Sequence, residues 1–267
     1  MTASGLQRIE GSALRFHLSG ALERPTSLVL LLHGSGTHGG DLLPVAERLS
    51  VLVPGALFVL PDAPQSYRDV LSPDDIAATE RERPGIDWEQ TRTWLRPVEA
   101  TSTAPSDQRY AFLGTVRTPV RAVNRLLDLL RARHELPDSA VAMYGFSQGG
   151  MMAVYVAIDR NDACAGVVCH SGQFYGADNI SARPPVLLMV GALELEPSQQ
   201  MSAVYPITVA ALRDAGLPFE EHACAALLHG MNPEAITRIG EFLSRALHAH
   251  GASDGFAHEG LRRQAQT

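Results

Sequence analysis

Short apolar runs alternate with helical patterns along most of the chain. Continuous apolar runs bounded by turn residues are typical of strands that helices cover on both faces. Such runs predict strands at residues 27–32, 56–60, 140–146, 165–169, 185–190 and 218–223. Between them, apolar residues at helical spacing predict helices at 41–52, 118–134, 151–158, 199–215 and 233–248. Alternation of this kind favours βαβ units and a mostly parallel central sheet with helices on both faces. Pro206 should kink or divide the fourth helix.

Residues 62–114 break this pattern. They are rich in Pro, Asp, Glu, Arg, Ser and Thr, and they hold both tryptophans, Trp88 and Trp94. Two interpretations of this long loop insertion are nearly balanced: a wall of the substrate pocket, which the tryptophans slightly favour, or a solvated insertion on the surface.

The apolar periodicity also stops after Gly251. We therefore expect residues 1–250 to form a single domain and residues 251–267 to be a flexible C-terminal tail. No internal repeat is present.

Composition excludes several classes of protein. The net charge is −7 and no run of basic residues occurs, so nucleic acid is not an expected partner. The first residues lack the features of an export signal, and no apolar run is long enough to span a bilayer, so we expect a cytoplasmic protein. Cys164, Cys169 and Cys224 have neither C-x-x-C spacing nor clustered histidines, which predicts buried free thiols without a disulfide framework or zinc site.

The segment from Gly145 to Gly149 fits G-x-S-x-G and lies where an apolar strand meets an apolar helix. A serine on such a sharp turn adopts strained backbone angles, which the flanking glycines allow, and its hydroxyl stands clear of the sheet. Ser147 is therefore the candidate nucleophile. The alternative is a structural glycine-rich turn.

A serine hydroxyl needs a base, and the base needs an orienting acid. His229 precedes Gly230 in a loop between the last predicted strand and helix, which suits an imidazole above the sheet edge. For the acid we prefer Glu194, which follows a predicted strand, and Glu196 is the alternative. If neither reaches His229, a backbone carbonyl or water would hold the imidazole. His170, directly after a strand, is expected at most to line the pocket.

The loop after the first predicted strand has the sequence HGSGTHGG. Its glycines allow amides to turn inward, so the amides of Ser35 and Gln148 form a candidate oxyanion hole. The loop has neither the Lys-Ser/Thr of a P-loop nor the G-x-G-x-x-G of a dinucleotide fold, which argues against phosphate binding.

Five segments together, LLLHGSGTHGG, FVLPDAP, YGFSQGGMM, PPVLLMVGALE and LLHGMNPEAI, resemble the carboxylesterase, acyl-protein thioesterase and phospholipase-like branch of the α/β hydrolases. The resemblance covers roughly residues 27–247, with gaps through 62–114. It implies an α/β-hydrolase fold, and it implies the nucleophile, base and oxyanion roles for Ser147, His229, Ser35 and Gln148. Family members usually carry Asp at the position of Glu194, and here Pro197 also comes one residue early.

These features predict a serine hydrolase that cleaves carboxylic esters or thioesters through an acyl-enzyme, with a small-molecule substrate and no metal or organic cofactor. Met231 and His170 join Trp88 and Trp94 as expected pocket residues. A homodimer is left open. Two rivals remain at this stage: an acyltransferase or cyclising enzyme that uses the same serine, and a non-catalytic binding protein on a hydrolase scaffold, which would be favoured if no glutamate reached His229.

Overall fold

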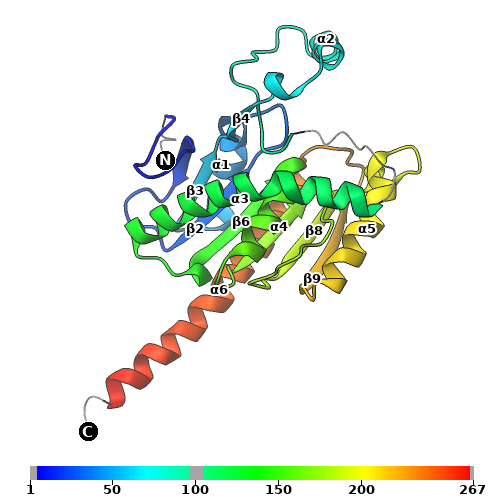
Figure 1. The fold of residues 1–267 in the computed structure, drawn as a ribbon. Coiled ribbons are helices and arrows are strands. Elements are labelled where there is room, and N and C mark those ends of the chain that lie inside the picture. Colours follow the sequence, from blue (N-terminus) through cyan, green and yellow to red (C-terminus); the bar gives the residue numbers. More distant parts are fainter. Residues whose placement is uncertain (1–4, 97–104, 265–267) are drawn as a thin grey trace.

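A seven-stranded sheet runs through the middle of the computed structural model, which describes residues 5–96 and 105–264 (Figure 1). Six neighbouring strands are parallel, and β1 at one edge is antiparallel to β3. In spatial order the strands are β1 (Phe16–Gly20), β3 (Ala56–Pro61), β2 (Ser27–Leu32), β6 (Val141–Phe146), β7 (Gly166–His170), β8 (Val186–Gly191) and β9 (Phe219–Cys224).

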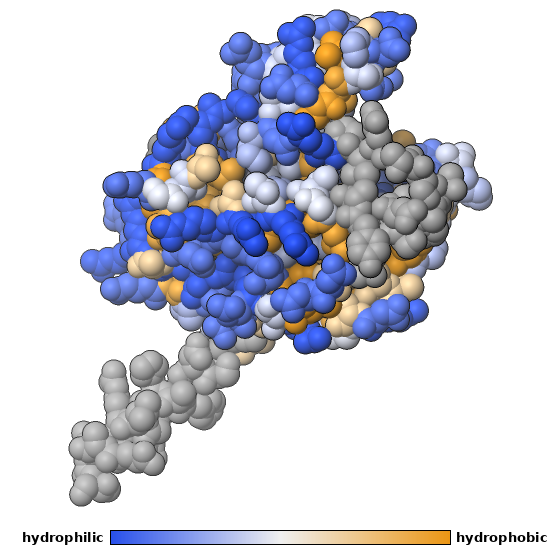
Figure 2. All heavy atoms as spheres, viewed as in Figure 1, coloured by the Kyte–Doolittle hydropathy of each residue, from blue (hydrophilic) through white to orange (hydrophobic). Residues whose placement is uncertain are grey.

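The sheet is buried on both faces because its strands are apolar in both directions. Successive side chains of β2 alternate between two hydrophobic clusters: Leu28, Leu30 and Leu32 belong to one, Val29 and Leu31 to the other. Helices that contribute to the first cluster are α3 (Pro105–His134), α4 (Gln148–Asp159) and α5 (Gln200–Asp214). Those that contribute to the second are α1 (Leu43–Leu52) and α6 (Pro233–Gln264). Figure 2 shows mostly hydrophilic residues along the outer side of α3, as expected of an amphipathic helix on a sheet.

The predicted α/β-hydrolase architecture is confirmed. All six predicted strands are present, each within one residue of its predicted bounds. The pattern missed β1, whose mixed sequence FHLSG is only partly buried at the sheet edge. Short 3-10 turns complete the domain: η1 (Gly39–Leu42), η2 (Arg68–Val70), η3 (Asp138–Ala140) and η4 (Ala192–Leu195).

The prediction of one long loop at residues 62–114 was wrong in part. The segment contains α2 (Pro73–Glu82), and β4 (Gln65–Ser66) pairs with β5 (Arg92–Thr93). Helix α3 begins at Pro105, not at residue 118 as predicted, because proline suits the first turn of a helix. Pro119 lies inside α3 and Pro206 inside α5. Of the two predicted effects of Pro206, a kink or a division, the division does not occur, because α5 is continuous.

The last helix is longer than its apolar face. The pattern ended it at residue 248, but α6 continues to Gln264 and extends away from the body of the molecule (Figure 1). The flexibility of residues 251–267 and the single domain at 1–250 stay predictions. No helix in the described part of the chain is long and apolar enough to cross a membrane.

Candidate active site

Ser147 occupies the sharp turn between β6 and α4. Its backbone angles, φ 54° and ψ −122°, are unusual for a residue with a side chain. The flanking glycines permit this turn, since a Cβ on Gly145 would lie 1.9 Å from the carbonyl oxygen of Gly149, and one on Gly149 would lie 2.0 Å from that of Leu32. The G-x-S-x-G pattern is therefore a steric requirement of the turn.

His229 and Glu194 come from two loops beyond the carboxyl ends of neighbouring strands. Glu194 lies in η4, directly after β8, and His229 lies between β9 and α6. The Nδ1 atom of His229 lies 2.6 Å from Oε2 of Glu194. The side chain of Glu194 is 4% exposed and that of His229 is 46% exposed, so the carboxylate is buried while the imidazole faces solvent. Glu194 thus reaches His229.

The second carboxylate oxygen of Glu194 is also occupied. Oε1 accepts a hydrogen bond from Ser171 Oγ at 2.5 Å and another from the Gly191 amide at 2.9 Å. Burial alone would raise the pKa of the Glu194 carboxyl, but the hydrogen bonds from His229, Ser171 and Gly191 outweigh it, and the pKa lies below its ordinary value. The carboxylate is therefore ionised and oriented at neutral pH.

Phe146, directly before Ser147, packs beside the imidazole of His229. The two ring centroids are 4.8 Å apart. The ring centroid of His170, on β7, lies 5.1 Å from that of Phe146. This contact limits where the half-exposed imidazole can lie.

Ser147, His229 and Glu194 line one cavity of about 390 Å³. Its other lining residues are Ser35, Gln148, Met151, Ser171, Gln173, Gln199, Gln200 and Met201. The candidate nucleophile, base, acid and oxyanion donors therefore share one opening above the carboxyl edge of the sheet, where open α/β sheets bind ligands.

Ser35 and Gln148 are joined to each other through the segment Thr93–Leu95. Oε1 of Gln148 accepts hydrogen bonds from Thr93 Oγ1 at 2.9 Å, the Trp94 amide at 2.7 Å and the Leu95 amide at 3.3 Å. Thr93 Oγ1 also lies 3.1 Å from Ser35 Oγ. Within the described residues, the backbone amides of Ser35 and Gln148 have no acceptor, as an oxyanion hole requires.

A family model described as phospholipase/carboxylesterase matches residues 112–247, about half of the chain. The chain belongs to this family. The matched range includes Ser147, Glu194 and His229 and excludes the loop that carries Ser35.

Among individual relatives of this phospholipase/carboxylesterase family member, acyl-protein thioesterase 1 of Cryptococcus neoformans is 26% identical over 151 residues, 56% of this chain. The chain spans about half, 55%, of the length of that relative. Two solved structures share its fold. Esterase PE8 is 22% identical, with 86% of this chain and 97% of that chain covered and a TM-score of 0.66. A carboxylesterase from Mesorhizobium loti is 16% identical, with 90% and 99% covered and a TM-score of 0.65.

None of the four residues that we expected in the pocket lines the cavity that contains Ser147. Trp94 is fully buried and donates its indole N–H to the His33 carbonyl, so it supports the start of the loop that carries Ser35. Trp88 hydrogen bonds to Glu80 in α2 and stacks on Tyr67, within the 62–114 segment.

Met231 packs against the cluster beneath α1 and α6, and His170 is fully buried on β7. Burial lowers the pKa of His170 to about 4, so this imidazole is neutral at physiological pH.

Sequence reasoning missed Ser171, Thr93 and three of the four glutamines that line the cavity. Ser171 has a positive φ of 50° directly after β7, and Thr93 lies in the segment expected to be a loop. Their roles depend on contacts between segments distant in the sequence, which no local pattern reports.

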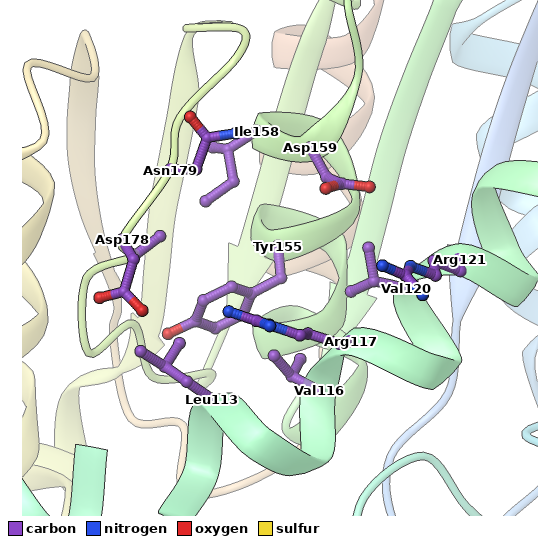
Figure 3. A pocket seen from close by; sticks show the side chains of 11 residues that line it. Leu113, Val116, Arg117, Val120, Arg121, Tyr155, Ile158, Asp159, Asp178 and Asn179 are labelled. Atoms are coloured by element: carbon purple, nitrogen blue, oxygen red, sulfur yellow. The ribbon is translucent and has the colours of Figure 1, made fainter. Parts of the chain in front are cut away.

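A second cavity of about 250 Å³ lies between α3, α4 and the loop at residues 177–179 (Figure 3). Apolar side chains of α3 and Tyr155 of α4 surround it, and Arg117, Arg121, Asp159 and Asp178 add charge. It contains none of the residues of the Ser147 cavity.

Two groups among the described residues bring metal-binding atoms together. They are His17 with His38 and Asp62, and His222 with Cys224 and Glu234. Neither group includes a residue of the cavity that holds Ser147.

Proposed function

We propose that this member of the phospholipase/carboxylesterase family is a serine hydrolase that cleaves small carboxylic esters or thioesters through an acyl-enzyme. Ser147 is the nucleophile, His229 the general base and Glu194 the acid that orients it. The observation that carries the proposal is the 2.6 Å contact between His229 and Glu194 in the same cavity as Ser147.

The proposed reaction begins with attack of Ser147 Oγ on the acyl carbonyl carbon. Because Glu194 engages Nδ1 of His229, Nε2 is the nitrogen that takes the serine proton. The protonated imidazole then gives that proton to the leaving alcohol or thiol, which leaves an acyl group on Ser147. Water attacks the acyl-enzyme, His229 accepts its proton, and the carboxylic acid departs.

The amides of Ser35 and Gln148 are proposed to stabilise the negative charge on the carbonyl oxygen during both attacks. Each such donor can contribute on the order of 3 kcal/mol to lowering the barrier. The segment Thr93–Leu95, which holds the side chain of Gln148, supports this role by keeping the start of α4 in place.

One rival, a non-catalytic binding protein, would be favoured if no glutamate reached His229. Glu194 does contact His229, so this observation does not favour that rival. No observation on the described residues favours an acyltransferase or a cyclising enzyme over hydrolysis. The cytoplasmic location stays a prediction, and a homodimer stays open.

The proposal is tested with p-nitrophenyl acetate and butyrate, with an acyl thioester of matched chain length, and with a fluorophosphonate probe. We expect turnover and labelling that Ser147→Ala abolishes. The ratio of ester to thioester rates then assigns the leaving atom. Labelling without turnover would replace hydrolysis by acyl transfer, and a wild-type protein that neither labels nor turns over would exclude the proposal.

A further inference from the structure

Three metal-binding side chains meet where β9 passes into α6. The Nδ1/Nε2, Sγ and carboxylate atoms that His222, Cys224 and Glu234 offer all lie within 4.8 Å of one another. Nε2 of His222 lies 3.1 Å from Oε1 of Glu234. This cluster is separate from the cavity that contains Ser147.

The fold itself brings these residues together. His222 and Cys224 are two positions apart on β9, so their side chains project from the same face of the sheet. That face packs against α6, because Cys224 belongs to the cluster that includes Ile236 and Ile239. Glu234 lies in the first turn of α6 and completes the group.

The donor set has the chemistry of a transition-metal site. Imidazole nitrogen, thiolate sulfur and carboxylate oxygen are the ligands that Zn²⁺ uses, at bond lengths of about 2.0–2.3 Å. Tetrahedral coordination at those lengths separates ligand atoms by roughly 3.3–3.7 Å, so the 3.1 Å imidazole–carboxylate pair already has nearly the required spacing. The sulfur needs to move by at most about an ångström.

We propose that His222, Cys224 and Glu234 bind a zinc ion, with water as the fourth ligand. The site lies beyond the proposed hydrolytic function and does not depend on it. The three ligands do not form a C-x-x-C motif or a histidine cluster in the sequence, and for this reason the sequence alone led us to expect no zinc site.

Neighbouring charges permit a cation here. His222 and Glu234 line a surface depression together with Thr237, Arg238 and Glu241, so an ion can enter from solvent. Arg238 pairs with Glu220 at 3.4 Å and with Glu241 at 3.7 Å, and Glu220 also pairs with Arg245. The guanidinium charges next to the site are thus balanced by carboxylates. Glu221, on the opposite face of β9, hydrogen bonds to Tyr205.

The second metal-like group is less suited to an ion. Asp62 already forms an ion pair with Arg15 at 3.1 Å and accepts the Gly39 amide, while His38 lies 3.4 Å from Asp41. That group also lacks a thiol.

The position of the cluster suggests what bound metal would do. Cys224 ends β9 and Glu234 lies at the start of α6, so the ion would join the two ends of the loop that carries His229. We infer that zinc restrains this loop, as a disulfide would, and so stabilises the folded protein.

Cadmium titration tests the ligand set, because a thiolate–Cd²⁺ bond gives an ultraviolet charge-transfer band that imidazole and carboxylate ligands do not. We expect one Cd²⁺ per chain, with the band lost in Cys224→Ser and kept in Cys164→Ser, a matched control at another buried thiol. It should also be kept in Ser147→Ala. Absence of the band in the wild type, or its survival in Cys224→Ser, would overturn the proposal.

Zinc affinity, measured by competition with a chelator, tests the other two ligands. His222→Gln and Glu234→Gln should each bind Zn²⁺ at least about tenfold more weakly, while the control His38→Gln should bind as the wild type does. Added Zn²⁺ should raise the melting temperature of the wild type and of Cys164→Ser but not of Cys224→Ser. Unchanged affinity in both ligand variants, each first checked to be folded without metal, would reject a site with these ligands.

Discussion

At the scale of single residues, Glu194 shows how a glutamate reaches the imidazole of His229 at a position where the family resemblance led us to expect the shorter Asp. The Gly191 amide donates to Oε1 of Glu194 three residues later, so the side chain folds back over the turn of η4. This bend takes up the extra methylene, and Oε2 still reaches His229. Ser171, directly after the neighbouring strand β7, donates a hydrogen bond to the same carboxylate.

Glu194→Gln should lower kcat/KM by about 10²- to 10⁴-fold, because a neutral amide neither orients the imidazole in the same way nor stabilises its protonated form. The measurement is steady-state hydrolysis of p-nitrophenyl butyrate. Glu196→Gln is the matched control, since Glu196 is the alternative acid and is exposed. Comparable losses in both variants would remove Glu194 from the mechanism.

At the scale of elements, the segment 62–114 contributes to the site in a way that its composition did not indicate. The short strand β5 and the two residues after it bind the side chain of Gln148, and Thr93 also contacts Ser35. Trp94 thus supports the loop that carries Ser35 and does not line the cavity that contains Ser147.

Thr93→Val should lower kcat roughly tenfold with little change in KM, because the two oxyanion amides would be held less firmly in the geometry of the transition state. Thr93→Ser, which keeps the hydroxyl, should restore most of the rate. Thr91→Val is the control, since Thr91 is also buried in this segment but hydrogen bonds to the Trp88 carbonyl. An unchanged kcat in Thr93→Val would exclude this positioning role.

The turn between β6 and α4 is an element that tolerates no extra atom. Gly149→Ala should destabilise the protein by at least about 3 kcal/mol in urea unfolding, because the new Cβ would overlap the Leu32 carbonyl. Gly114→Ala, in α3 where nothing lies within 4 Å, should instead be neutral or stabilise by up to about 1 kcal/mol. A mild effect of Gly149→Ala would show that the strand and helix can move apart.

At the scale of the whole molecule, two buried imidazoles couple folding to pH. Burial lowers the pKa of His33 and of His170 to about 4. Both are neutral in the folded protein at pH 5, whereas in the unfolded chain, with an ordinary pKa near 6.5, they take up protons. Their contribution to stability is complete above that ordinary value and falls as the pH drops toward 4.

Between pH 7.5 and 5, each imidazole should therefore reduce the free energy of unfolding by about 2 kcal/mol. His170→Asn should remove roughly half of the combined fall, since the amide can still meet the Tyr144 hydroxyl but does not titrate. Urea unfolding at pH 7.5 and at pH 5 measures this fall in the free energy of unfolding, and the fall can be compared even if the variant is less stable at pH 7.5. A fall equal to that of the wild type would contradict the burial argument.

The sequence by itself determined six strands of the sheet, the order of strands and helices along the chain, and the turn that carries Ser147. Each of these rests on local physics: apolar runs must be buried, and a strained turn requires glycine at the positions of Gly145 and Gly149. The same local rules missed β1 and the start of α3 at Pro105, where partial burial and a polar sequence hide the element.

Only the tertiary structure brought Glu194 to His229, moved Trp94 from the pocket to the core, and brought Thr93 to Gln148. It also gathered His222, Cys224 and Glu234 at one point. These contacts join segments far apart in the chain, and they depend on how loops turn beyond the strand ends. The spacing of hydrophobic residues does not predict how these loops turn, because loop conformations are set by the packing of the completed fold.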